Sequence, residues 1–352
     1  MTAKNLSIQG LMIGRNFPVR VESMLKTPLS DPMGCLDQLK DLSSEKCELV
    51  RIALPSMDWC DNFAEVVKRS PIPVMADIHF DYKLALKAIE AGCKAIRINP
   101  GNMGTGAGLR ALVDCAKNNG TVIRVGANSG SINTFQLREA RGDMSKALFI
   151  AVEEQIRLLL DNGFEDIILS AKSTNVSETV NSNILLSEKY PDFPFHIGIT
   201  EAGPGYRGIA KSSVGLSILL SQGIGDTIRV SLTDSPVLEV KVAYEILRSL
   251  GLRNIGPEIV SCPTCGRKRI NVYKIVQELE PFFSKLPDKF KIAVMGCEVN
   301  GPREAQNADL GIAGTINGFV IFKKGKVIRK CDRNELEDVL SDLIEEDCAD
   351  KP

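Results

Sequence analysis

The amino-acid sequence predicts an α/β protein in which a (β/α)8 TIM-like barrel, residues 1–255, precedes a smaller α+β domain, residues 256–352. Three observations predict this fold class. Short apolar, β-branched runs alternate with amphipathic helical segments, which is typical of βαβ units around a parallel sheet. There are eight such runs, the number that closes a barrel of this type. The alternation stops near Gly256, where a different pattern begins.

The eight runs predict the barrel strands in chain order. They are Val19 to Met24, Glu48 to Pro55, Pro73 to Phe80, Ala95 to Asn102, Thr121 to Asn128, Asp166 to Ser173, Phe195 to Ala202 and Thr227 to Asp234. Each run ends in polar residues, and the carboxyl ends of the strands form the active-site face of such a barrel. The side chains expected around this mouth are Arg51, Asp77, His79, Arg97, Asn99, Arg124, Asn128, Lys172, Glu201, Arg229 and Ser231.

The segments between the runs predict helices. DYKLALKAIEAG and SKALFIAVEEQIRLLLDNG carry apolar residues at i, i+3, i+4 and i+7, and each ends at a glycine, a common helix terminator. SPVLEVKVAYEILRSLGLRN predicts the last barrel helix, and NIGPE predicts a linker. Beyond it we expect a helix over VYKIVQELEPFF, a strand at FKIAVMG, a hairpin through GFVIFKKGKVIRK and an acidic helix at NELEDVLSDLIEE.

The composition limits the classes of function. A formal charge of -1 and a pI near 6.3 argue against a protein that works by neutralising a nucleic acid or a membrane surface. The segment MTAKNLSIQG has no apolar stretch behind its lysine, and no stretch approaches the roughly 20 apolar residues of a membrane span. We therefore expect a cytoplasmic protein, whose ten cysteines are reduced thiols.

Four cations are predicted at the ends of four different strands: Arg51, Arg97, Arg124 and Lys172. Singly, each is explained by a surface salt bridge. Guanidinium groups match phosphate oxygens in a bidentate way, however, so four cations converging on one mouth favour a phosphate or diphosphate ligand.

Other residues of the predicted mouth are candidates for proton transfer. Asp77 and His79 lie at i and i+2 of one run and face the same side of a strand, as an acid/base pair requires. The alternative for His79 is a buried histidine with its hydrogen bonds satisfied. Glu201 is a candidate proton donor or orienting carboxylate, and a salt bridge to Arg229 is its alternative. His196 starts a run, far from the mouth, so we expect a structural role.

The segment SCPTCGRKR places Cys262 and Cys265 in a C-x-x-C clip, and MGCEVNGPREA adds Cys297. Three thiolates leave the fourth ligand of a tetrahedral set unassigned. Cys331 would complete a structural zinc site, although it has no clip partner. Glu304 follows Cys297 by seven residues across an Asn-Gly-Pro turn. A hard carboxylate beside three thiolates suits an iron-sulfur cluster with one displaceable ligand. Spacing alone leaves both alternatives open.

Together, these motifs resemble one known family nearly end to end. The segments that carry the resemblance are VESM, PVMADIHF, AIRINPGN, IRVGAN, HIGITEAG, GIAKSSVGLSILLSQGIGDTIRVSLT, SCPTCGR and MGCEVNGPREA. The chain resembles the 4-hydroxy-3-methylbut-2-enyl diphosphate synthase family of the non-mevalonate isoprenoid pathway. The resemblance implies that the smaller α+β domain is an iron-sulfur domain. One four-iron four-sulfur (4Fe-4S) cluster per chain would be held by Cys262, Cys265, Cys297 and Glu304.

The resemblance also implies an oxidoreductase that opens the ring of 2-C-methyl-D-erythritol 2,4-cyclodiphosphate by two-electron reduction, with loss of a hydroxyl. Flavodoxin or ferredoxin would donate the electrons. The chain would form a head-to-tail homodimer, with the small domain of one subunit over the barrel mouth of the other. Glu201 would manage the proton of the departing hydroxyl, and Asn300 would place a substrate oxygen. The implied substrate-binding residues are Arg51, Asp77, Arg97, Arg124, Asn128, Lys172 and Ser231.

Two positions depart from the family pattern, because Glu298 and Arg303 stand where an apolar residue and a glycine are usual. They leave the ligand spacing intact but place charge where it would tune the cluster's potential. Two rival hypotheses belong to other classes. One is a zinc-stabilised binding protein whose basic mouth holds a nucleic acid or a phosphorylated partner. The other is a pterin-synthase-like barrel that catalyses a condensation without redox chemistry and would not need the C-terminal cysteines.

Overall fold

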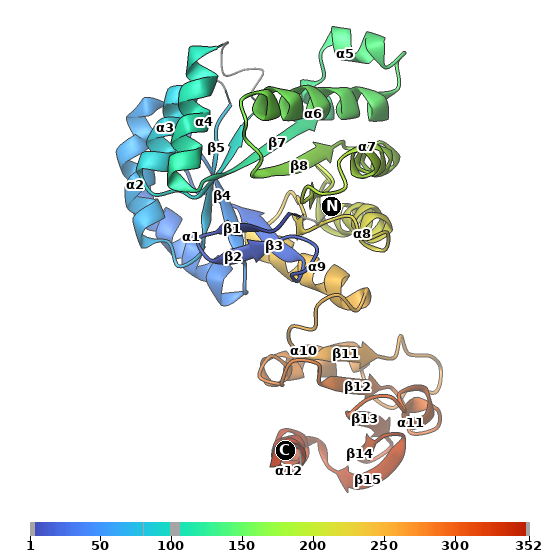
Figure 1. Ribbon diagram of the computed structural model, residues 1–352. Coiled ribbons are helices and arrows are strands. Elements are labelled where there is room, and N and C mark those ends of the chain that lie inside the picture. Colours follow the sequence, from blue (N-terminus) through green and yellow to red (C-terminus); the bar gives the residue numbers. More distant parts are fainter. Residues whose placement is uncertain (1–3, 80, 99–105, 350–352) are drawn as a thin grey trace. The chain divides into compact units, whose positions relative to one another are not determined.

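A computed structural model describes residues 4–79, 81–98 and 106–349. The chain divides into two compact units, Met1–Arg253 and Asn254–Pro352, each with its own sheet and core (Figure 1). The first unit is a ring of parallel strands covered by helices, and the second is a smaller mixed sheet with helices on its faces. The predicted fold class is therefore confirmed.

Eight parallel strands form the barrel, in the order β8-β7-β6-β5-β4-β3-β10-β9. A bridge between Leu169 and Phe195 joins the two ends of this order and closes the ring. Each predicted run contains one strand, but β9 and β10 keep only two residues of regular pairing each. Asn99 and the end of its run lie outside the described residues. The strands are β3 Arg20–Met24, β4 Leu49–Ala53, β5 Val74–Asp77, β6 Ala95–Ile98, β7 Val122–Asn128, β8 Ile167–Lys172, β9 His196–Ile197 and β10 Thr227–Ile228.

Amphipathic helices cover the outside of the barrel (Figure 1). Side chains cap several of them: the Asp31 carboxylate accepts a hydrogen bond from the first turn of α1, and Asp81 does the same for α3. Gly120, with φ +59, ends α4 in the left-handed conformation. The helices are α1 Pro32–Ser44, α2 Cys60–Arg69, α3 Tyr82–Glu90, α4 Ala107–Asn119, α5 Thr134–Glu139, α6 Met144–Asp161, α7 Val176–Lys189, α8 Gly205–Leu220 and α9 Pro236–Ser249.

A β-hairpin that the sequence pattern did not predict covers the amino-terminal end of the barrel. It consists of β1 Leu6–Ile8 and β2 Leu11–Ile13, paired antiparallel. Its buried side chains pack against the first or second residue of five barrel strands, so the hairpin plugs the end opposite the mouth. The barrel residues in this cluster are Leu49, Met75, Ala95, Val122 and Ile168.

The second unit is built on a five-stranded sheet in the order β11-β12-β13-β14-β15. β11 to β13 are parallel, and β14 and β15 continue as antiparallel hairpins. α10 Val272–Phe283 and α12 Leu336–Ala349 pack on one face through large apolar side chains, whereas α11 Gly301–Glu304 precedes small residues that pack on the other. The strands are β11 Glu258–Ser261, β12 Lys291–Met295, β13 Leu310–Thr315, β14 Gly318–Lys323 and β15 Lys326–Cys331.

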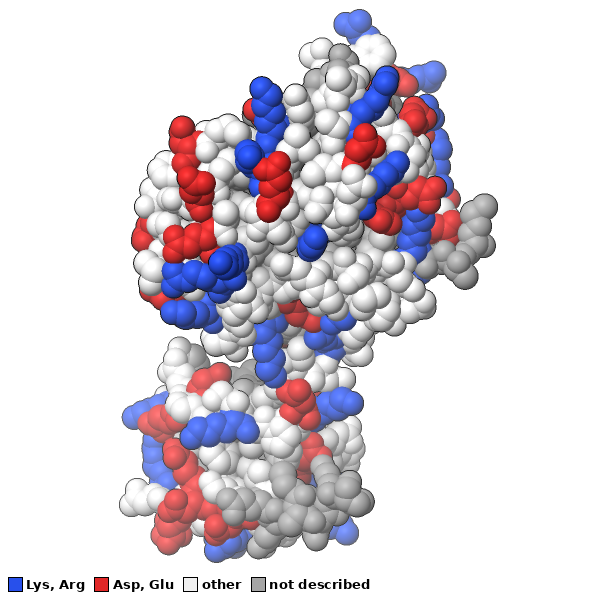
Figure 2. Space-filling view, turned by 60° about the vertical axis from the view of Figure 1, so that its left-hand side comes forward, with Lys and Arg blue, Asp and Glu red and all other residues white. Residues whose placement is uncertain are grey.

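The surface agrees with the charge balance of the sequence. On the face drawn in Figure 2, basic and acidic side chains are interspersed. Across the part of the chain that the structure describes, no helix combines the length and the apolar character that a membrane span needs.

Ile8→Ala tests the hairpin plug. The Ile8 side chain is 0% exposed, and truncating such a residue costs about 2–5 kcal/mol of unfolding free energy. Ser7→Ala is the matched control, because Ser7 is exposed on the same strand. Urea denaturation is expected to show this loss for Ile8→Ala and less than about 0.5 kcal/mol for Ser7→Ala. Equal stability of the two variants would contradict the plug.

Candidate functional site

Charged residues stand at one level on neighbouring barrel strands, although Arg51 and Arg124 lie inside β4 and β7 and not at the strand ends where they were predicted. The parallel register pairs Asp77 of β5 with Arg97 of β6, and Arg97 with Arg124 of β7. One carboxylate oxygen of Asp77 lies 3.4 Å from Nη1 of Arg97, and the other lies 3.5 Å from Nε of Arg51. Two of the predicted cations thus flank one buried carboxylate.

The predicted pair of Asp77 and His79 is also brought together. Nε2 of His79 lies 3.6 Å from Oδ2 of Asp77, and the His79 side chain is 56% exposed. Burial alone would raise the pKa of Asp77, but the hydrogen bond from His79 and the positive charges of Arg51 and Arg97 hold that pKa well below its usual range. Asp77 is therefore an anion at neutral pH and serves as counter-charge for the arginines.

Arg124 and Glu22 meet across the barrel interior. Arg124 is on β7 and Glu22 is on β3, and three strands separate them in the sheet. Nη1 of Arg124 nevertheless lies 2.5 Å from Oε2 of Glu22, and both residues are only 1% exposed. A buried cation without a counter-charge is strongly destabilising. Glu22 is therefore the residue that allows an arginine inside the barrel.

Charged side chains gather inside the barrel and are called the cage below: Glu22, Arg51, Asp77, Arg97, Arg124, Lys172 and Arg229. Several buried polar atoms of the cage lack a hydrogen-bond partner. Among the described residues they include Nη2 of Arg124, Nε of Arg51, Nε of Arg229 and Oε1 of Glu22. A buried donor left without an acceptor costs about 1–3 kcal/mol. Three guanidinium groups that each keep one nitrogen without an acceptor match a ligand rich in acceptor oxygens, such as a phosphate.

Lys172 lies deeper than the sequence pattern indicated. It is only 7% exposed, and its Nζ lies 2.8 Å from Nε2 of His196, a fully buried histidine. His196 is the first residue of β9, as expected, but the sequence pattern did not indicate its contact with a predicted mouth residue. The Lys172 side chain bends down into the barrel, so that the start of β9 and the end of β8 share a contact.

The predicted mouth residues of the last two runs lie after their strands. Arg229 was the alternative salt-bridge partner expected for Glu201. Its Nη2 lies instead 3.4 Å from Oε2 of Glu239 in α9. Glu201 is exposed with φ +48, in the left-handed region that non-glycine residues rarely adopt. The next residue's N–H donates to the carbonyl oxygen of Ser231 at 3.2 Å, which ties these two loops together. Asn128 ends β7 and caps the short 3-10 turn that follows.

In the second unit, one cavity of about 200 Å³ is lined by all four predicted cluster ligands and by Asn300. β11 leads into Cys262 and Cys265, and β12 leads into Cys297. Because β11 and β12 are adjacent parallel strands, their carboxyl ends bring the clip and the lone cysteine to one edge of the sheet. Glu304 closes the cavity from α11. The predicted ligands that line it are Cys262, Cys265, Cys297 and Glu304.

Local backbone geometry holds this cavity in shape. The Thr264 N–H donates to Sγ of Cys262 at 3.2 Å and fixes the turn between the two cysteines of the clip. The Arg269 N–H donates to the carbonyl of Gly296 at 2.7 Å and ties the clip to the turn of Cys297. A Cβ on Gly301 would lie 2.6 Å from Cβ of Met295, so only glycine fits there.

The donor set of this cavity, three thiols and one carboxylate, is one that an iron-sulfur cluster accepts, with each ligand bonding a different iron. In the described ranges, no group of three His, Cys, Asp or Glu side chains has the geometry to hold a metal ion.

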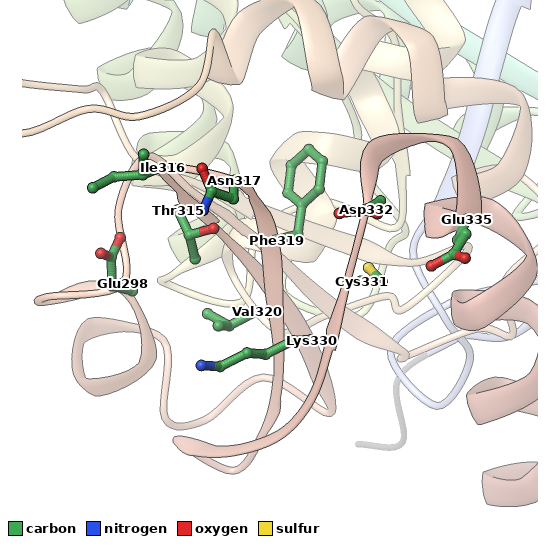
Figure 3. Close-up of a pocket in the computed structure, with 10 residues that line it drawn as sticks. All are labelled: Glu298, Thr315, Ile316, Asn317, Phe319, Val320, Lys330, Cys331, Asp332 and Glu335. Atoms are coloured by element: carbon green, nitrogen blue, oxygen red, sulfur yellow. The ribbon is translucent and has the colours of Figure 1, made fainter.

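Cys331, the fourth ligand in the zinc hypothesis, lies in another cavity of the same unit. That cavity has a volume of about 550 Å³, and its lining includes Cys331 but none of the other three cysteines. Figure 3 shows the Cys331 sulfur on one side of it and the Glu298 carboxylate on the other. The structure thus groups Glu304, rather than Cys331, with the three thiols.

Three residues of the barrel site were missed at the sequence level. Glu22 holds Arg124, and Glu239 holds both Arg229 and Lys26, the last at 3.0 Å. Thr227 contacts the imidazole of His196. The available signal was a carboxylate inside an apolar run, as in VESM, because such a group is rarely buried without a charged partner.

These features define a class of protein: a TIM barrel with a cationic interior, joined to a smaller unit whose cavity presents three thiols and a carboxylate. Comparison with known proteins agrees for both units. The GcpE TIM-barrel domain matches residues 3–244, and the GcpE protein C-terminal domain matches residues 258–346. The chain belongs to the GcpE family.

Relatives match over nearly the whole chain. A protein of Thermodesulfovibrio yellowstonii is 45% identical over 97% of this chain and 97% of its own length. One of Clostridium tetani is 46% identical over 95% of each chain. Both are named 4-hydroxy-3-methylbut-2-en-1-yl diphosphate synthase (flavodoxin).

Solved structures show the fold of the barrel alone. Dihydropteroate synthase of Yersinia pestis superposes with a TM-score of 0.51 at 16% identity, covering 71% of this chain and 100% of its own. The enzyme of Xanthomonas albilineans gives 0.52 at 13% identity, covering 71% of this chain and 99% of its own.

Asp77→Asn probes the cage through its pH dependence. The folded-state pKa of Asp77 is depressed, so its carboxylate stabilises the fold above the unfolded pKa of about 3.9 and loses that effect as pH falls toward the folded value. At neutral pH we expect a loss of about 3 kcal/mol, because two arginines lose their counter-charge.

Urea unfolding measured across pH checks this. The difference between wild type and Asp77→Asn should be constant from about pH 8 to pH 5 and should shrink below about pH 4. A difference that grows in acid would show that Asp77 is not the anion that balances the cage.

Proposed function

We propose that this chain catalyses the reductive ring opening of 2-C-methyl-D-erythritol 2,4-cyclodiphosphate, with loss of a hydroxyl, to 4-hydroxy-3-methylbut-2-enyl diphosphate. The observation that carries the proposal is that one chain holds both a buried cation cage with unsatisfied donors and a cavity lined by three thiols and a carboxylate. Two-electron reduction of the carbon skeleton of a cyclic diphosphate needs both parts: positive charge that binds the phosphates, and a redox centre. The family's place in the non-mevalonate isoprenoid pathway supports the same reaction.

Cys262, Cys265, Cys297 and Glu304 would hold one four-iron four-sulfur cluster per chain. When bound, such a cluster supplies electrons one at a time. Glu304 is the exchangeable ligand in this proposal, because its hard oxygen bonds iron less strongly than a thiolate does. Asn300 lines the same cavity, where its amide would orient a substrate oxygen.

The barrel residues would bind and orient the diphosphate. Arg51 and Arg97 keep 16% and 13% of their side chains exposed and are the outermost cations of the cage. Arg124 and Lys172 would supply positive charge from deeper in the barrel, and Asp77 would hold the Arg51 and Arg97 side chains in place. Asn128 and Ser231 would donate hydrogen bonds at the rim.

Glu201 would protonate the departing hydroxyl so that it leaves as water. The carboxylate stands on a loop tied to Ser231, beside the proposed diphosphate site. Its left-handed φ of +48 is a conformation that costs on the order of 1–3 kcal/mol, and such strain is concentrated at functional sites.

Flavodoxin is the proposed electron donor, since the relatives' names specify it, and ferredoxin is the alternative.

The head-to-tail homodimer stays a prediction. Light scattering should give a particle mass of about twice the 38.4 kDa of one chain, and the mass of a monomer would rule out the homodimer. We expect the enzyme to work in the cytoplasm.

Arg51→Ala and Arg97→Ala should each weaken substrate binding about tenfold or more, because each removes a charged hydrogen bond to phosphate worth about 1.5–3 kcal/mol. Lys68→Ala, on the exposed outer face of α2, is the control. The measurement is calorimetric titration of substrate into oxidised, cluster-loaded protein without reductant. Unchanged affinity in both arginine variants would refute the assigned anion site.

Glu304→Ala should alter the cluster but not the fold. Three thiolates remain, so the protein should still take up cluster, but the iron without its carboxylate should be lost readily to oxygen, leaving a three-iron form. Turnover should fall by orders of magnitude. Cys331→Ser is the matched control, because only the zinc hypothesis gives Cys331 a role as a ligand.

Metal content, visible absorption and reductive turnover of both variants, prepared without oxygen, decide between the hypotheses. An unaffected Glu304→Ala beside a metal-free Cys331→Ser would overturn the ligand assignment.

A further inference from the structure

A hydrogen-bonded chain of buried groups runs below the diphosphate cage. Nζ of Lys172 lies 2.8 Å from Nε2 of His196, and Nδ1 of His196 lies 2.8 Å from Oγ1 of Thr227. The exposed fractions of these three residues are 7%, 0% and 1%. Oε2 of Glu22 lies 3.6 Å from the same Nδ1, so the chain ends at the carboxylate that also holds Arg124.

The backbone makes room for this arrangement. A Cβ on Gly198 would lie 3.3 Å from Nζ of Lys172 and 2.5 Å from the carbonyl oxygen of Arg229. Because Gly198 has no side chain, the space through which Lys172 reaches His196 stays open. A lysine that merely bordered the mouth would need no such space.

The hydrogen bonds fix where protons sit when Lys172 is charged. An ammonium group only donates, so Nε2 of His196 must accept and the imidazole is neutral with its proton on Nδ1. That proton points toward Thr227 and the Glu22 carboxylate. When Lys172 is neutral, its amine either accepts a hydrogen bond from Nε2 of His196 or donates only a weaker one between two neutral groups. One proton thus changes the whole chain of contacts.

The surrounding charges oppose that proton in the ligand-free cage. Burial and the positive charges of Arg124, Arg51 and, more weakly, Arg229 lower the pKa of Lys172 well below its usual value, and the Glu22 carboxylate opposes this shift only in part. Burial and the same cations also lower the pKa of His196. A diphosphate entering the cage brings negative charge that reverses this balance.

We propose that His196 is a positioning residue for substrate binding, and that the Lys172–His196 pair takes up one proton from solvent when the cyclic diphosphate enters the cage. The proton bonds to the Lys172 amine. The resulting ammonium donates to His196 and to a phosphate oxygen, and no covalent bond to the substrate forms. This inference rests on the proposed function, because it takes the cyclic diphosphate as the ligand.

Titration calorimetry in buffers of different ionisation enthalpy measures the proton directly. Each phosphorus of the cyclic diphosphate carries one strongly acidic oxygen, so the ligand itself does not titrate near neutral pH. Oxidised, cluster-loaded protein without reductant binds substrate but does not turn it over. Wild type should take up close to one proton, and its affinity should fall by up to tenfold per pH unit as pH rises from the free toward the bound pKa of the pair.

Variants assign the proton to the pair. Lys172→Met should abolish both the uptake and the pH dependence. His196→Phe should weaken binding about tenfold and reduce the uptake, whereas His196→Gln, which keeps an acceptor at similar reach, should restore affinity. His79→Gln, at the other histidine of the chain, should leave the uptake intact. Thr227→Val serves if the His196 variants do not fold, and it should shift the pH profile because Nδ1 loses its acceptor.

The outcomes separate this inference from the proposed function. Tight binding with buffer-independent heats and flat pH dependence would overturn the inference and leave the function standing. An uptake lost in His79→Gln but kept in Lys172→Met would also overturn it. Absence of binding to a wild-type protein with an intact cluster would overturn the proposed function, and the inference with it.

Discussion

The constraint on which the barrel depends is the burial of more positive than negative charge inside its ring of strands. Taking a charged group out of water costs several kcal/mol even after the protein relaxes. Two carboxylates each serve more than one cation: Asp77 lies between Arg51 and Arg97, and Glu239 serves Arg229 and Lys26. The cage remains short of negative charge and of hydrogen-bond acceptors. In the proposed function a diphosphate supplies both.

Other features of the barrel follow from this constraint. A polar interior contributes little apolar burial, and the lower barrel compensates with the hairpin plug, where Ile8 and Ile13 fill the end opposite the mouth. The regular pairing of β9 and β10 is short, and Glu201 and Ser231 lie in the segments that follow. The second unit has the opposite design, because a conventional apolar core supports one polar edge where the cysteines emerge.

Much of this was predictable from the sequence, because strand runs, their polar ends and the cysteine spacing are local signals. Each of the eight runs contains a strand of the barrel sheet, although Arg51 and Arg124 lie inside their strands and not at the ends, and Asn99 lies outside the described residues. The partners of the cations were not predictable. Arg124 finds Glu22 across 102 residues of sequence, and only closure of the barrel brings them together. The contact between Lys172 and His196 was missed because the position of a residue in its run does not show how far a lysine on the neighbouring strand bends downward.

The central claim is that one chain supplies both the cation cage and a cluster held by three cysteines and a glutamate. The most direct measurement is iron, sulfide and zinc analysis of the full chain purified without oxygen, followed on the same sample by an assay of cyclodiphosphate reduction. The account predicts a brown protein with about four irons and four sulfides per chain that forms the linear allylic diphosphate. A colourless protein with stoichiometric zinc, no sulfide and no product would contradict it.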